Sequence, residues 1–338
     1  MVAAMADPTP RVLTGIQPSG TIHLGNYFGA IAQCISLQNE FPGESFFFIA
    51  DYHALTTIHD GDKLRDLVRE LAMTYLACGI DPDKAVLYRQ SDIPEVTELT
   101  WLLSTVTGMG LLERAHSYKD KVARGIKPSA GLFFYPALMA ADILMPRSTL
   151  VPVGKDQVQH VEMTQDMATH FNERFGGGET ILVRPECRLS KAAYVPGTDG
   201  QKMSKSYGNL IPLFESGKRL KKIVGAVVTD STALGEPLDP DACNVFALLK
   251  LFCDEEELAR IAGFYRAGSR DAQPFGYGHA KQLLAGHIET FFAPARARYE
   301  HLRAHPEEVD AVLERSAARA RDVAQKTLYD CRRACGLV

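Results

Sequence analysis

Apolar positions along this chain follow two alternating patterns. Short, almost continuous apolar runs are typical of buried strands, and they recur at residues 11–16, 45–50, 85–89, 149–153 and, more weakly, 180–184. Between these runs apolar residues recur every three or four positions, as in helices, most clearly at residues 62–78, 95–107 and 156–175. The alternation predicts an α/β fold, a Rossmann-like doubly wound parallel sheet.

The pattern changes near Pro212, where the strand-like runs cease. Residues 257–338 then have an almost uniformly helical pattern, rich in Ala, Arg and Glu. We therefore expect a flexible N-terminus (1–10), a Rossmann-like domain (11–206) and a helical region (207–338). The last helix is expected to pack back on the Rossmann-like domain.

Composition and charge are those of an ordinary globular protein. The 338 residues are 46% apolar and 23% charged, and a net charge of −4 means that nucleic-acid binding would need a local basic patch. Seven scattered cysteines without a CxxC pair favour a reducing, cytoplasmic location. The first ten residues lack a signal-peptide pattern, and the longest apolar run, residues 130–145, is too short to cross a bilayer. We expect no membrane partner.

Polar residues follow several of the predicted strands. Doubly wound sheets bind ligands beyond the carboxyl ends of their strands, so residues at these ends are candidates for a site. They are His23 and Asn26 after the first run, Asp51 and His53 after the second, and Gly154, Asp156 and Gln157 after the fourth.

Two stretches have the chemistry of a phosphate site. In "HLGN", residues 23–26, a histidine and an asparagine stand at a helix start, whose free N–H groups favour anions, and Gly25 permits close approach of a ligand. The glycine-rich loop "PGTDGQKMSKSYGN", residues 196–209, carries Lys202 and Lys205, which suit a polyphosphate that is gripped and released. Taken alone, such a lysine pair is more often a solvated surface loop.

Together the two stretches resemble the paired signatures of class I aminoacyl-tRNA synthetases, since "KMSKS" at 202–206 fits letter for letter. Further stretches are similar to the tryptophanyl-tRNA synthetase family: "GIQPSG" (15–20), "GNYFGAI" (25–31), "YPALMAADIL" (135–144), "VPVGKDQVQH" (151–160) and "AVVTDS" (226–231). The resemblance implies activation of L-tryptophan by ATP and Mg²⁺, then transfer to the terminal ribose of tryptophan tRNA. It makes residues 11–206 a catalytic domain that contains a dimerisation insertion and the KMSKS loop.

The resemblance also implies roles for individual residues. The catalytic residues would be His23, Asn26, Lys202 and Lys205. ATP would be bound by Gln17, Ser19, Gly25, Asn26, Gly154, Asp156, Met203 and Ser204. For Asp156 a structural role is also open, and Lys119 and Lys121 either approach the ATP phosphates or form a solvated turn.

An acidic residue in an apolar segment marks the amino-acid pocket. Pro136 suits a first helical position, which predicts a short buried helix over residues 136–145, and Asp142 within it needs a polar partner. By resemblance, Asp142 accepts the indole N–H of tryptophan. Tyr135, Met139 and Gln157 would hold or line the substrate, and His53 would lie near it or serve the structure.

The resemblance further implies a homodimer and recognition of the tRNA anticodon by the helical region (207–338). Candidate phosphate contacts are Lys218, Arg219, Lys221, Lys222, Arg315, Arg319, Arg332 and Arg333, although solvated helix faces explain most such charges. Some relatives hold an iron–sulfur cluster on four cysteines, but only Cys243 fits one of those positions, so we expect no iron–sulfur cluster. Leu13 and Lys155 replace the Phe and Glu common in relatives.

Three alternatives remain open at this point. Tyrosyl-tRNA synthetase also uses an Asp on a comparable helix, although Met139 and "GIQPSG" favour tryptophan. A nucleotidylyltransferase could carry a motif like HLGN but not the complete KMSKS loop. A non-catalytic RNA-binding relative would not need His23, Asn26, Lys202 and Lys205.

Overall fold

The computed structural model describes residues 10–115, 129–189 and 194–338. Lys119, Lys121 and residues 1–9 lie outside the described residues. The described chain forms two compact units. We call residues 10–19, 34–115, 129–189 and 305–338 the sheet unit, and residues 20–33 and 194–304 the helical unit. The units are not continuous in the sequence: residues 20–33 pack with the helices of the second unit, and the last helix packs with the sheet.

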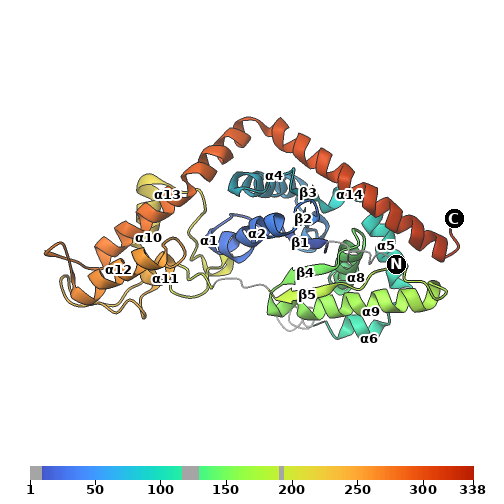
Figure 1. Cartoon of the computed structure of the whole chain (residues 1–338), viewed down its shortest axis with the longest axis horizontal. Coiled ribbons are helices and arrows are strands. Elements are labelled where there is room, and N and C mark those ends of the chain that lie inside the picture. The colour runs from blue at the N-terminus through green and yellow to red at the C-terminus, as the bar shows by residue number, and fades with distance from the viewer. Residues whose placement is uncertain (1–9, 116–128, 190–193) are drawn as a thin grey trace, which may run out of the picture. The chain divides into compact units, whose positions relative to one another are not determined.

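Five parallel strands form the centre of the sheet unit, as the sequence pattern predicts (Figure 1). The strands are β1 Val12–Ile16, β2 Ser45–Ile49, β3 Ala85–Arg89, β4 Leu150–Val153 and β5 Glu186–Leu189. Their order in the sheet is β3-β2-β1-β4-β5, so the strand order reverses between β1 and β4. The carboxyl ends of strands at such a reversal are where doubly wound sheets bind ligands.

Helices flank this sheet. They are α2 Ala32–Glu40, α3 Asp51–Ala54, α4 Gly61–Cys78, α5 Glu95–Ser104, α6 Met109–Glu113, α8 Ala130–Leu144, α9 Val158–Phe175 and α14 Pro306–Ala334, with 3₁₀ turns η2 Gln90–Asp92 and η3 Lys155–Gln157. Helix α14 packs against β3, α4 and α5 (Figure 1). Among the described residues, no helix combines the length and apolar character that a membrane crossing requires.

The strand predicted at residues 180–184 is wrong, since the fifth strand is Glu186–Leu189. Ile181 and Leu182 are buried, but the side chain of Asn172 on α9 satisfies their backbone groups. Its Oδ1 accepts from both N–H groups, at 3.0 and 2.9 Å, and its Nδ2 donates to the Leu182 carbonyl at 2.8 Å. Because Asn172 already satisfies these backbone groups, Ile181 and Leu182 need no hydrogen bonds from a neighbouring strand.

The helix predicted over residues 136–145 begins six residues earlier, at Ala130. Ser129 caps its start by accepting a hydrogen bond from the Leu132 N–H at 3.1 Å. Pro136 therefore lies inside α8, where it deprives the Leu132 carbonyl of its usual helical donor. The capping serine prevails over the proline as the start signal.

The helical unit contains α1 Leu24–Asn26, the π-helical turn η1 Tyr27–Ile31, the 3₁₀ turn η4 Lys205–Tyr207, α10 Gly217–Gly225, α11 Asn244–Leu249, α12 Glu255–Ala267, the hairpin β6 Ser269–Arg270 and β7 Gln273–Pro274, and α13 Tyr277–Ala304. An aromatic cluster explains why residues 20–33 belong here. The rings of Tyr27 and Phe292 lie 4.9 Å apart edge to face, and those of Phe28 and Phe252 lie 5.3 Å apart. The helix start at His23 is thereby fixed to α13.

Candidate active site

The predicted helix start at "HLGN" is confirmed. His23 precedes α1 as its N-cap residue, and the Asn26 Oδ1 accepts from the His23 backbone N–H at 3.1 Å. The Leu24 N–H donates to the Ile211 carbonyl at 3.0 Å, which ties the motif to the segment after the lysine loop. The His23 ring is buried, and among the described residues its Nδ1 has no hydrogen-bond partner. A buried polar atom of this kind is available to a ligand.

The lysine loop lies against this helix start. A Cβ built on Gly25 would meet Met203 at 3.5 Å, so the two motifs are in near contact. Burial, and secondly the charge of Lys205, lower the pKa of His23 to about 4. Burial also lowers the pKa of Lys205. At neutral pH the pair therefore presents a neutral imidazole beside a partly desolvated ammonium group.

Asn209 organises the lysine loop, and the sequence reading missed it. Its buried side chain accepts from the Ser204 N–H at 2.8 Å and donates to Asp199 at 2.6 Å and to the Lys202 carbonyl at 3.2 Å. A Cβ on Gly197 would lie 2.2 Å from the Asn209 amide, so glycine is required there. Two residues of the "PGTDG" stretch are thus explained by the fold, since Gly197 makes room for the Asn209 side chain and Asp199 accepts a hydrogen bond from it.

A buried carboxylate stands in the sheet unit. Asp142 on α8 is 3% exposed, and both of its oxygens lie 2.8 Å from the Gln90 Nε2. The His53 Nε2 lies 2.9 Å from the Asp142 Oδ2. Burial raises the pKa of Asp142, while hydrogen bonds from His53 and Gln90 act in the opposite direction. The polar partners expected for Asp142 are therefore His53, which follows β2, and Gln90, which follows β3.

Tyr135 and His160 form a second polar pair beside this carboxylate. The Tyr135 hydroxyl lies 2.8 Å from the His160 Nε2, and the rings of Tyr135 and His53 lie 6.2 Å apart edge to face. Burial raises the pKa of Tyr135 to about 12, so the phenol keeps its proton. Met139 lies one turn after Tyr135 on α8 and packs partly buried against the core.

The ends of β1 and β4 carry the remaining predicted residues. Gln17 donates from Nε2 to the His53 carbonyl at 3.2 Å. Gln157 donates to the Asp156 Oδ2 at 2.9 Å, and a Cβ on Gly154 would lie 2.7 Å from the Asp156 Oδ1. These side chains follow strands at the sheet reversal, as the sequence pattern predicted.

Comparison with known proteins settles the family. The family model of class I tRNA synthetases for tryptophan and tyrosine (W and Y) matches residues 5–293. A tryptophan–tRNA ligase of Rhodopirellula baltica is 51% identical over 327 residues, covering 97% of this chain and 99% of that protein. The chain belongs to the tryptophanyl-tRNA synthetase family. A tryptophan–tRNA ligase of Campylobacter jejuni is 48% identical over 328 residues, covering 97% of this chain and all of that protein.

A solved structure has the same architecture. The crystal structure of the tryptophanyl-tRNA synthetase from Campylobacter jejuni, complexed with ADP and tryptophan, aligns with a TM-score of 0.89 at 47% identity, covering 97% of this chain and 100% of that one. The Rossmann-like fold with a C-terminal helical region is thereby confirmed.

In this member of the tryptophanyl-tRNA synthetase family, the predicted site residues fall into two groups. The helical unit holds His23, Gly25, Asn26, Lys202, Met203, Ser204 and Lys205. The sheet unit holds Gln17, Ser19, His53, Tyr135, Met139, Asp142, Gly154, Asp156 and Gln157. Gln90 and His160 were missed, although Gln90 directly follows β3 and obeys the strand-end rule applied to the other strands.

Proposed function

We propose that this synthetase activates L-tryptophan with ATP, giving tryptophanyl-adenylate and pyrophosphate, and then transfers tryptophan to the 3′-terminal ribose of tryptophan tRNA. Relatives named as tryptophan–tRNA ligases at about half identity over nearly the whole chain support this function. The structural observation that best supports the proposal is Asp142, a buried hydrogen-bond acceptor in an apolar helix. Indole has one N–H donor and no acceptor, so a carboxylate is its natural partner.

The helical-unit residues supply the phosphate chemistry of this proposal. The tryptophan carboxylate attacks the α-phosphorus, its new P–O bond forms as the bond to pyrophosphate breaks, and negative charge spreads over the phosphate oxygens. A neutral His23 donates a hydrogen bond to such an oxygen without holding its own charge in a buried site. Lys202 and Lys205 bind the leaving pyrophosphate, and Gly25 leaves room for the nucleotide.

Mg²⁺ fits this scheme as a companion of ATP. Among the described residues, no group of three or more His, Cys, Asp or Glu side chains is arranged to hold a metal ion. Because Mg²⁺ is commonly bound through substrate phosphates and water with few protein ligands, we propose that it enters with ATP. Its charge would offset that of the phosphates.

The sheet-unit residues supply amino-acid recognition. We propose that Asp142 accepts the indole N–H, that the Tyr135 phenol and Gln157 hold the amino or carboxylate end, and that Met139 lines the ring. Gln17, Ser19, Gly154 and Asp156 serve the nucleotide. The chemistry of this group differs from that of the lysine loop, since it consists of neutral donors and one buried acid.

Transfer RNA is the proposed macromolecular partner, bound through its anticodon by the helical region (207–338). Lys218, Lys221 and Lys222 lie exposed on α10, where they suit contacts to the RNA backbone. The candidates on α14 are less available, because Arg332 pairs with Glu98 at 2.8 Å and Arg319 donates to the Pro82 carbonyl at 3.1 Å.

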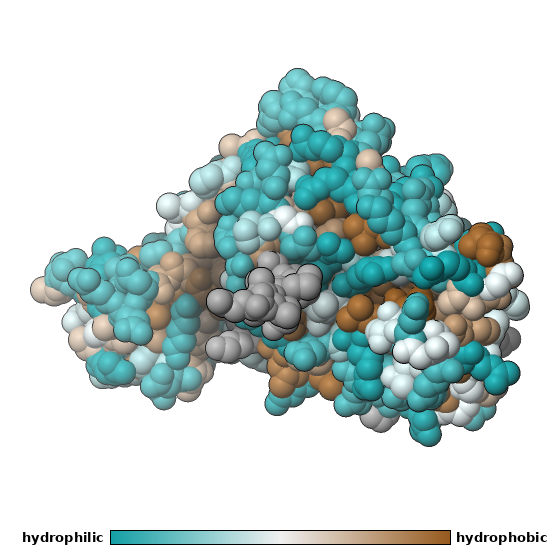
Figure 2. Space-filling view, turned by 45° about the vertical axis from the view of Figure 1, so that its right-hand side comes forward, coloured by the Kyte–Doolittle hydropathy of each residue, from teal (hydrophilic) through white to brown (hydrophobic). Residues whose placement is uncertain are grey.

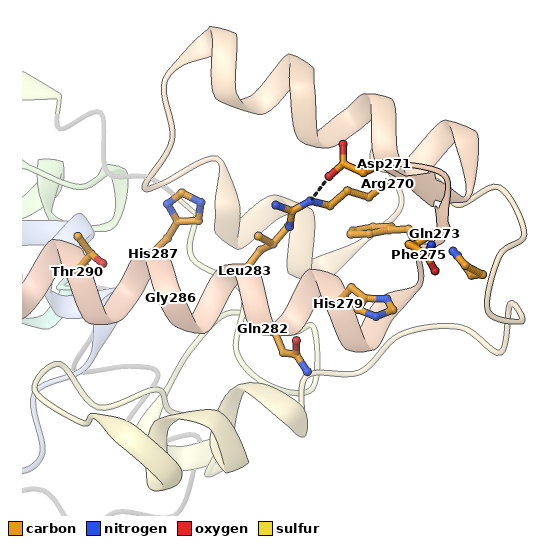
Figure 3. A pocket seen from close by; sticks show the side chains of 11 residues that line it. Arg270, Asp271, Gln273, Phe275, His279, Gln282, Leu283, Gly286, His287 and Thr290 are labelled. Atoms are coloured by element: carbon orange, nitrogen blue, oxygen red, sulfur yellow. Dashed lines mark ion pairs between the residues drawn. The ribbon is translucent and has the colours of Figure 1, made fainter.

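A cavity of about 710 Å³ lies between the β6–β7 hairpin and α13. Figure 3 shows Arg270, His279, Gln282 and His287 around it, all with polar groups that can contact RNA. Its place in the helical unit makes it a second candidate for tRNA contact.

A homodimer is the proposed assembly. The sheet unit exposes large apolar side chains, with Trp101 69% and Met109 61% exposed, and a cavity of about 320 Å³ lies beside Leu55, Phe134 and Leu138. Figure 2 shows apolar residues gathered at the surface of this part of the molecule. Such surface favours a protein partner. We also propose a cytoplasmic location, supported by seven free cysteines.

The test is aminoacylation with purified protein. Labelled tryptophan should be attached to a tryptophan tRNA transcript, and labelled tyrosine to neither tryptophan nor tyrosine tRNA. Charging of tyrosine tRNA with tyrosine instead would overturn the proposal.

A further inference from the structure

Gln90 is the most completely enclosed polar side chain beside Asp142. It is 0% exposed and is the first residue of the η2 turn, directly after β3. Its Nε2 donates to both oxygens of Asp142 at 2.8 Å, and its Oε1 accepts from the His53 backbone N–H at 3.3 Å. A reversed amide would place an oxygen against the carboxylate and an NH₂ against an N–H, so only one orientation is satisfied.

This orientation is held on both sides of Gln90. The following residue, Ser91, donates from its N–H to Asp51 at 3.0 Å and from its hydroxyl to the same carboxylate. The preceding residue, Arg89, donates to Asp92 from its backbone N–H at 3.1 Å and from Nε at 3.0 Å. Three consecutive residues are therefore anchored by side chains, and the Gln90 amide has little freedom to turn.

The consequence falls on Asp142. A carboxylate has about four lone-pair directions, and Gln90 and His53 occupy up to three of them. The two donors act against the effect of burial on the Asp142 pKa, and they fix the rotation of the carboxylate about its Cβ–Cγ bond. The remaining acceptor direction is then fixed as well.

We propose that Gln90 is a positioning residue for tryptophan selection, acting through Asp142 by holding its carboxylate oriented toward one N–H donor. The inference rests on the proposed function. Gln90 itself needs no contact with the substrate, and its effect should depend on whether the substrate has an indole N–H.

The experiment compares two substrates in amino-acid-dependent ATP–pyrophosphate exchange. One is tryptophan, and the other is 3-(benzothiophen-3-yl)alanine, in which sulfur replaces the N–H. Gln90→Met keeps the length of the side chain but removes its donors. It should lower kcat/KM for tryptophan about tenfold or more, with less than about a threefold change for the sulfur analogue.

The matched control is Gln38→Met. Gln38 is also buried in the sheet unit and makes one donated and one accepted bond, to the Gly79 carbonyl at 2.8 Å and from the Asp81 N–H at 2.9 Å. Loss of these two hydrogen bonds in Gln38→Met should lower folding stability but leave the preference for tryptophan over the analogue unchanged.

A second variant keeps the inference testable if Gln90→Met folds poorly. In Gln90→Glu the new glutamate lies against Asp142, and like-charge repulsion raises the pKa of the glutamate. The glutamate can donate a hydrogen bond to Asp142 only when it is protonated. Relative to wild type, kcat/KM for tryptophan should rise as the pH falls from 8 to 6.

Two results would overturn the inference. An equal loss for both substrates in Gln90→Met, or a Gln90→Glu pH profile parallel to wild type, would make Gln90 a structural residue only. Wild-type protein without any tryptophan-dependent exchange would instead contradict the proposed function, so the two failures are distinguishable.

Discussion

His23 is a buried histidine whose pKa is lowered to about 4, first by burial and then by Lys205. Below its ordinary pKa of 6.5 the unfolded chain takes up a proton that the folded chain accepts only near pH 4. Its contribution to stability is therefore intact above pH 6.5 and is lost as the pH falls toward 4. We predict that urea unfolding of wild type loses more stability between pH 7 and pH 5 than that of His23→Asn. Equal losses would show that His23 titrates normally in the folded protein.

Lys205 belongs to the same group of helical-unit residues as His23 and is expected to act on the leaving pyrophosphate. Lys205→Ala should slow tryptophan activation by about 10²–10³-fold, the scale for removing one transition-state donor, with tryptophan affinity little changed. Single-turnover kinetics measure this. Lys250→Ala, at another lysine of the helical unit that pairs with Asp241 at 3.7 Å, is the control and should leave the rate unchanged. An unchanged rate for Lys205→Ala would make it a surface charge.

Asp142→Asn should damage amino-acid recognition selectively. An amide accepts more weakly than a carboxylate, and its NH₂ would face the donors of Gln90 and His53. We predict a loss of roughly ten- to two-hundred-fold in kcat/KM for tryptophan, with the KM for ATP nearly unchanged. Steady-state exchange kinetics with tryptophan, tyrosine and phenylalanine test this, and retained wild-type selectivity would contradict the pocket assignment.

The sequence predicted which residue types the site needs but not their partners. His23, Lys205 and Asp142 could be singled out because motif, helix start and apolar context are local signals. Gln90 follows a predicted strand and could have been a candidate, but its partner Asp142 lies 52 residues away in the chain. His160 had no such signal, and only the fold brings it to Tyr135, 25 residues away. Asn209 was likewise missed, since its role is to hold the backbone of a loop.

At the scale of elements, periodicity predicted four strands and the long helices to within a few residues. It failed at β5 and at the start of α8, and in both places a single side chain decided the outcome. Asn172 replaced strand pairing at Ile181 and Leu182, and Ser129 capped a helix before its proline. Such side-chain-to-backbone bonds compete with regular structure and leave little trace in an apolar pattern.

An ion pair between Arg321 and Glu95 joins helix α14 to α5 within the sheet unit. It leads to a prediction at the scale of elements. Glu95 is 8% exposed and accepts from Arg321 at 2.7 Å and from Gln325 at 3.2 Å. Burial alone would raise the pKa of Glu95, but the bonds from Arg321 and Gln325 lower it. The contribution is therefore present above a pH of about 4.5 and is lost as the pH falls below it.

We predict that Arg321→Ala lowers the free energy of unfolding at pH 7 by about 1–3 kcal/mol, because a buried acceptor loses its main donor. The control is Arg333→Ala on the same helix, an exposed pair 4.0 Å from Asp330, which should cost less than about 0.5 kcal/mol. Chemical denaturation at pH 7 and pH 3 measures both. A difference between wild type and Arg321→Ala that persists undiminished at pH 3 would contradict the ion-pair account.

For the molecule as a whole, the two groups of site residues belong to different compact units. The helical unit holds the neutral imidazole and the lysines, whereas the sheet unit holds the buried acid and its donors. Sequence order alone could not assign residues 20–33 to the helices, because that assignment depends on aromatic contacts with Phe252 and Phe292.

Activation of tryptophan is the central step of the proposed function, so ATP–pyrophosphate exchange without tRNA tests the proposal most directly. We predict exchange that requires tryptophan, with tyrosine and phenylalanine supporting it at least about 100-fold less well, since neither satisfies the buried Asp142 as indole does. Folded wild-type protein that shows no tryptophan-dependent exchange, or that prefers tyrosine, would contradict it.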